Sequence, residues 1–105
     1  MYLLNSNHAI QAKLKREIKM KVQNMTSSNG NTIANQFIIY NDNEQFFQSY
    51  DSLIVKISQG KTFLDSNTWD YSKTTAKYRN QFLGETTKET QSKINSGEYI
   101  LTNLN

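Results

Sequence analysis

Residues 66–84 read Ser-Asn-Thr-Trp-Asp-Tyr-Ser-Lys-Thr-Thr-Ala-Lys-Tyr-Arg-Asn-Gln-Phe-Leu-Gly, and this stretch holds the clearest helix pattern in the second half of the chain. Ser72 is a typical N-cap residue, because its hydroxyl oxygen can accept a hydrogen bond from a free backbone amide of the first turn. Asp70 is the competing N-cap. Gly84 is the expected left-handed end. The face expected to be apolar runs at helical spacing through Tyr71, Thr75, Tyr78 and Phe82.

Two interpretations of this helix are open. In the first, the helix packs on a sheet and its cations are simply solvated. In the second, its start forms a contact surface, because Trp, Tyr and Arg are the residues most often found at interface hot spots. The candidate partner-binding residues of this surface are Trp69, Tyr71, Lys73, Lys77 and Arg79.

The charge of the chain is concentrated near its amino terminus. The 105 residues suffice for one domain and carry a net charge of +3. Five of the twelve lysines and arginines lie between residues 13 and 21, with Glu17 the only acid there, whereas residues 22–105 carry seven basic and eight acidic side chains. We therefore divide the chain into a basic amphipathic arm, residues 1–20, and a single near-neutral domain, residues 21–105.

The arm is expected to be a basic helix. Ile10, Leu14 and Ile18 recur every four residues, but an isolated helix of this length is marginal in water and needs a surface. The stripe could pack on the domain, the cations could bind phosphates or an acidic partner, or the arm could lie on an anionic membrane. The last reading lacks the Trp and Phe expected at a membrane surface, and we expect no membrane partner. The arm's candidate partner-binding residues are Lys13, Lys15, Arg16 and Lys19.

The first half of the domain is expected to form a sheet. A turn at Asn29-Gly30 precedes a β-rich run over residues 33–40, and a second run over residues 45–50 follows. Consecutive Phe46 and Phe47 must point to opposite faces of a strand, so at least one of them belongs to the core. Residues 53–57 predict a further strand, with a short helix as the alternative.

The second half returns to the sheet after two helices. Gln59-Gly60 has the spacing of a two-residue hairpin. Thr86 and Glu89 match a capping box for a helix that ends at Gly97, and residues 98–102 read as a final strand. The predicted fold is α+β: an antiparallel sheet of four to six strands with two short helices on one face and a basic N-terminal helix.

No pattern of catalytic residues is present. The only histidine, His8, lies in the arm, and there is no cysteine, which argues against histidine-activated nucleophiles and zinc hydrolysis. Asp65 and Asp70 are the best carboxylate pair for a magnesium site, but such residues are more often turn and cap residues. We therefore expect a protein that is not an enzyme and has neither a metal site nor a cofactor.

Residues 20–105 resemble a family of small proteins found in bacteriophages and other mobile elements. The shared marks are a Ser-Tyr-Asp-Ser strand turn at residues 49–52 and a Ser-x-Thr-Thr-x-Lys helix start at residues 72–77. The family has no assigned reaction. The resemblance implies a phage gene, whose product would act in the host cytoplasm; no signal-peptide pattern occurs at the amino terminus.

The resemblance favours a protein that binds and inhibits a host defence nuclease or ribonucleoprotein complex, an anti-CRISPR-like role. The alternative is an accessory protein of phage replication or gene regulation that binds nucleic acid through the arm. A structural or self-associating phage component is a third class, because exposed sheet edges can pair.

Overall fold

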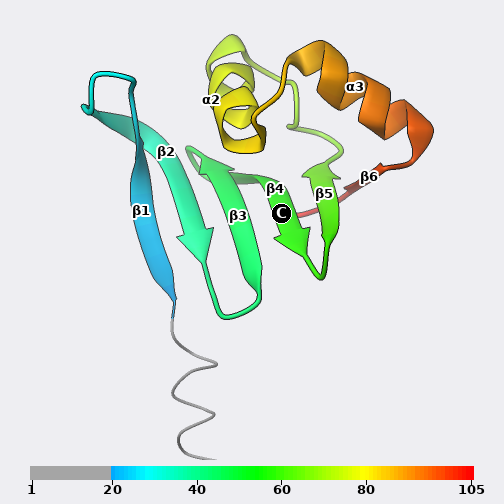
Figure 1. The fold of residues 1–105 in the computed structure, drawn as a ribbon, viewed down its shortest axis with the longest axis horizontal. Helices are drawn as coiled ribbons and strands as arrows, with labels where there is room; N and C mark the ends of the chain where they lie inside the picture. The colour runs from blue at the N-terminus through cyan, green and yellow to red at the C-terminus, as the bar shows by residue number, and fades with distance from the viewer. Residues whose placement is uncertain (1–19) are drawn as a thin grey trace, which may run out of the picture.

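A computed structural model describes residues 20–105 of the chain (Figure 1). The elements follow in the order β1 (Lys21–Thr26), β2 (Thr32–Tyr40), β3 (Glu44–Ser49), β4 (Ser52–Ser58), β5 (Lys61–Asp65), α2 (Lys73–Leu83), α3 (Thr87–Ser96) and β6 (Tyr99–Thr102). The expected N-terminal helix lies outside the described residues, apart from Met20, which directly precedes β1.

The six strands form one mixed sheet in which spatial order follows sequence order. Strands β1 to β5 are antiparallel neighbours, whereas β6 runs parallel to β5. The prediction of an entirely antiparallel sheet is therefore wrong. The reason is the connection: both helices lie between β5 and β6, and a crossover of that length returns the chain to the same end of the sheet, so that the next strand is parallel.

Local turn chemistry fixes the hairpin between β4 and β5. Gln59 and Gly60 both have positive φ, 53° and 75°, which matches the twist of the flanking strands. Residues 53–57 lie in β4, so the predicted strand is confirmed and the alternative short helix is wrong.

A β-bulge directs two consecutive side chains of β4 into the core. Phe47 pairs with Val55 while Gln48 pairs with Leu53, so Ile54 has no partner on β3. Such a bulge interrupts the alternation of side chains between the two faces. Ile54 and Val55 are accordingly both fully buried although they are neighbours in sequence.

Both helices begin and end at the residues that the sequence predicts. Ser72 caps α2 by accepting the amide of Thr75, and Gly84 ends this helix with a φ of 70°. Thr86 and Glu89 form the reciprocal capping box of α3, which ends at Gly97. Asp70 is therefore not the cap of α2.

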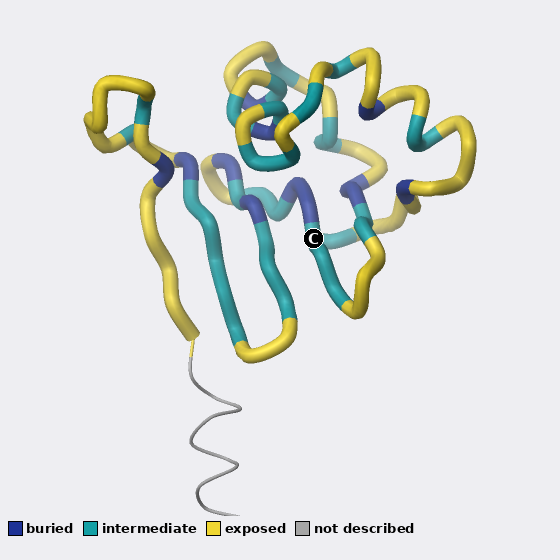
Figure 2. Tube along the Cα trace, viewed as in Figure 1, coloured by how far each residue is buried: buried dark blue, intermediate teal, exposed yellow. Residues whose placement is uncertain are grey.

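The core lies between one face of the sheet and the two helices. Figure 2 shows buried residues concentrated where the strands lie nearest the helices. The ring of Phe47 stacks on that of Phe82 from α2, with the centroids 5.8 Å apart. The remaining buried apolar residues are Met25, Ile54, Val55, Leu64 and Tyr99.

The two neighbouring phenylalanines of β3 should differ in what they contribute to stability. Phe47→Ala should lower the free energy of unfolding by about 3–4 kcal/mol, because it removes a fully buried ring and leaves a cavity. Phe46→Ala, on the opposite face, should cost less than about 1.5 kcal/mol. Urea unfolding measures both, and equal losses would contradict this division of the sheet into two faces.

Candidate functional site

The start of α2 presents an exposed aromatic and cationic surface. Tyr71, which directly precedes the N-cap Ser72, is 50% exposed, and Lys73 and Lys77 of α2 are exposed as well. Tyr71 and Lys73 line a shallow hollow together with Asp70, Ser72 and Ala76. We call Tyr71, Lys73 and Lys77 the α2 surface.

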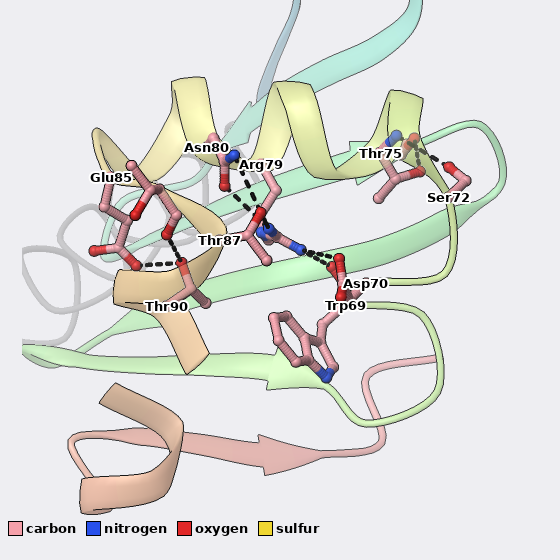
Figure 3. A network of polar contacts seen from close by, with 11 residues as sticks. Trp69, Asp70, Ser72, Thr75, Arg79, Asn80, Glu85, Thr87 and Thr90 are labelled. Atoms are coloured by element: carbon pink, nitrogen blue, oxygen red, sulfur yellow. Dashed lines mark hydrogen bonds and ion pairs between the residues drawn. The ribbon is translucent and has the colours of Figure 1, made fainter. Parts of the chain in front are cut away.

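Arg79 does not belong to this surface, because its side chain is fully buried. Its Nη1 donates to the backbone oxygen of Trp69 and, at 3.3 Å, to Asp70 Oδ1. Its Nη2 donates to Asn80 Oδ1 at 3.0 Å and to Thr87 Oγ1 at 2.7 Å (Figure 3). The expectation that Arg79 is accessible to solvent or to a partner is corrected: its guanidinium joins α2 to the preceding loop and to α3.

Trp69 has a mainly internal position as well. It is partly buried, packs against the core, and its ring lies 5.0 Å from the guanidinium carbon of Arg79. The structure therefore brings Trp69 and Arg79 together beneath the α2 surface.

Four candidate residues of the arm lie outside the described residues: Lys13, Lys15, Arg16 and Lys19. Their predicted role in partner binding stays a prediction.

A second polar network joins α3 to β6. Glu85 Oε1 accepts hydrogen bonds from Lys93 Nζ and from the Tyr99 hydroxyl, each at 2.8 Å, and Oε2 accepts one from the Thr90 hydroxyl. Burial would raise the pKa of Glu85, but these hydrogen bonds outweigh it and hold that pKa below its ordinary value of 4.5. The bond to Glu85 in turn raises the pKa of Lys93.

The two carboxylates considered for a magnesium site serve different contacts. Asp65 is buried and accepts hydrogen bonds from the backbone amides of Leu104 and Asn67 and from the Thr68 hydroxyl. Asp70 instead pairs with Arg79. Within residues 20–105, no three His, Asp or Glu side chains gather closely enough to hold a metal ion. No helix in that part of the chain is long and apolar enough to cross a membrane.

A second surface, which was not predicted from the sequence, lies on the face of the sheet opposite the core. The strand register places six residues side by side, one from each strand, and five of them are apolar. We call them the open row: Val22, Ile39, Phe46, Lys56, Phe63 and Ile100. The consecutive pairs Ile38-Ile39 and Phe46-Phe47 could have revealed it, since neighbours on a strand face opposite sides.

Residues 20–98 match a family of unknown function (DUF8033). The chain belongs to this family. The DUF8033 match includes strands β1 to β5 and both helices, so it contains the α2 surface and all of the open row except Ile100. It confirms membership in a family without an assigned activity, over nearly the range expected from the resemblance. No curated protein and no solved structure matches the chain.

Removing the buried cation should destabilise the fold. Arg79→Ala should lower the free energy of unfolding by about 3 kcal/mol, because it opens a cavity and leaves partly buried acceptors without their donor. Lys77→Ala, an exposed cation of the same helix, should change it by less than about 0.5 kcal/mol. Thermal or urea unfolding checks both, and an Arg79→Ala protein as stable as the natural one would contradict the internal role.

The Glu85 network should make stability depend on acidic pH. Since the folded pKa of Glu85 lies below its unfolded value, its contribution is present above about pH 4.5 and is lost as the pH falls through the folded pKa. Glu85→Gln should therefore be less stable at neutral pH and lose less stability between about pH 5 and pH 3. Urea midpoints across this range test this. Parallel pH profiles of the two proteins would refute it.

Proposed function

We propose that the chain is a non-enzymatic phage-type protein that binds and inhibits a defence nuclease complex in the cytoplasm of its host. The observation that carries the proposal is the α2 surface, an exposed tyrosine just before α2 together with two exposed lysines in the first half of that helix. Tyrosine is enriched at interface hot spots. Lysine side chains suit the phosphates and acidic grooves of a nuclease that carries guide RNA.

The polar network beneath the α2 surface supports this proposal. Arg79 Nη1 ties the second half of α2 to Trp69 and Asp70 in the loop before the helix, and its Nη2 ties α2 to α3 through Thr87. A surface held in place before binding loses little conformational entropy when a partner docks. Inhibition needs no chemistry from the inhibitor, only a fitted surface that blocks a site on the nuclease.

The phage origin implied by the resemblance favours a host defence complex as the target. In this proposal the arm residues Lys13, Lys15, Arg16 and Lys19 add a second contact, toward bound guide RNA or an acidic groove.

A nuclease inhibition assay tests the proposal. In molar excess, the full chain should inhibit target-DNA cleavage by a purified, guide-RNA-loaded defence nuclease of its host. The triple variant Tyr71→Ala, Lys73→Glu, Lys77→Glu should lose at least about tenfold in potency, which corresponds to about 1.4 kcal/mol. Lys88→Glu, the same charge change at an exposed lysine of α3, is the control and should inhibit normally.

Two results of this assay would count against the proposal. If the natural chain inhibits none of the guide-loaded nucleases of its host, the function is not inhibition of this class. If it inhibits but the triple variant is as potent as the Lys88→Glu control, the α2 surface is not the contact.

One observation favours nucleic-acid binding as a second candidate. Phe37, Phe46 and Phe63 lie on the open face of the sheet. Lys56 lies on β4, between the strands that carry Phe46 and Phe63. Aromatic rings on a sheet can stack the bases of a single strand. Fluorescence anisotropy with a labelled single-stranded oligonucleotide, repeated across salt concentrations, separates the candidates. Binding that weakens steeply with salt supports this one.

A further inference from the structure

The open row is an apolar surface that the core does not use. Among the described residues, none of its members belongs to the buried core or to the partly buried residues packed against it. Val22 and Ile100, at the two ends of the row, are 57% and 38% exposed, and the four residues between them are half-buried. The apolar side chains of both helices instead pack against the core on the opposite face, through Tyr78, Phe82, Leu83 and Ile94.

We propose that the open row binds the open row of a second copy of this chain, so that two sheets pack face to face about a two-fold axis. A two-fold interface brings the same patch of each copy together. Facing sheets bury their inner side chains in a layer about 10 Å thick. The inference does not rest on the proposed function, because the α2 surface lies on α2, away from this face.

The dimensions of the face fit a weak dimer. Six strands about 4.8 Å apart span about 24 Å, and a six-residue strand such as β3 is about 20 Å long. Each copy would thus contribute about 500 Å², or about 1,000 Å² for the pair, close to the lower limit of specific interfaces. We therefore expect a dimer that dissociates on dilution rather than a permanent one.

The charges of the open face favour a second copy of the chain over a partner that is strongly acidic or strongly basic. Lys56 lies in the row, and its Nζ is 3.4 Å from Glu44 Oε2. The register also places Glu44 on the open face, because it is two residues from Phe46 on the same strand. Lys61 is on the open face too, because it is two residues from Phe63 on β5. A strongly acidic partner would be repelled by Glu44 and a strongly basic one by the two lysines, whereas a two-fold copy can offer opposite charges to both signs.

The long stem of Lys56 also suits an apolar contact. Its Nζ lies 5.8 Å from the ring centroid of Phe63, so its methylenes cover part of the row while the ammonium stays with Glu44. The domain contributes little overall repulsion, since residues 22–105 have seven basic and eight acidic side chains. Two copies can therefore approach without a large electrostatic cost.

Sedimentation velocity on the full chain, over a concentration series from micromolar to near-millimolar, tests the proposal. The mass should rise with concentration from that of one 12.2 kDa chain toward twice that value. Phe46→Glu should shift the midpoint of this rise at least about tenfold higher, because it places charge in the contact. Tyr71→Glu, the same kind of change at an exposed aromatic just before α2, is the matched control and should leave the midpoint unchanged.

A cross-linking experiment tests the proposal independently if Phe46→Glu fails to fold. The natural chain has no cysteine, so a single Phe46→Cys variant carries one thiol. Facing sheets lie about 10 Å apart, too far for a disulfide but within reach of a short bis-maleimide. Phe46→Cys should give covalent dimers, and Tyr71→Cys should give none above background.

Every other outcome overturns the inference. A chain that stays monomeric at all concentrations forms no such dimer. If the Phe46→Cys thiol of that monomer is unreactive, residues 1–19 cover the face. If the thiol reacts freely, the face is open to solvent. A mass that changes only when a single-stranded oligonucleotide is added, and no longer changes in Phe46→Glu, assigns the face to nucleic acid. A dimer that is insensitive to Phe46→Glu and cross-links through Tyr71→Cys uses the helix side instead.

Discussion

The alternation of side chains along a strand is the constraint on which the whole structure depends. Two short helices can cover only one face of a six-stranded sheet, yet the strands carry apolar residues on both faces. Phe47 is fully buried beneath α2, whereas its neighbour Phe46 must point the other way. The fold therefore has one face that forms a core and one apolar face that no described residue of the helices packs against.

The helix layer is held by buried polar groups as much as by apolar packing. The fully buried residues of α2 are Thr75 and Arg79, and that of α3 is Thr90. Thr75 shares a 2.9 Å hydrogen bond with Ser49 of β3, so even the contact between helix and sheet is partly polar. Such networks fix one arrangement of the elements, because an unsatisfied buried group is costly. The α2 surface is rigid for this reason.

Features set by local chemistry could be predicted from the sequence, and features set by tertiary contacts could not. The caps at Ser72 and Thr86 and the turn at Gln59-Gly60 depend on neighbouring residues alone, and all were predicted. The direction of β6 depends on where the crossover returns. The burial of Arg79 depends on Trp69 and Thr87, which reach it only in the folded chain, so its accessibility was predicted wrongly. Of the candidate site, Tyr71, Lys73 and Lys77 are exposed as the contact hypothesis requires.

The central claim is that the two faces of the sheet differ in their contact with water. Solvent paramagnetic relaxation of aromatic protons, measured by NMR at high dilution with a soluble paramagnetic agent, tests it most directly. The account predicts clearly stronger enhancement for Phe46 and Phe63 on the open face than for the fully buried Phe47. Equal, weak enhancement of all three rings would contradict it.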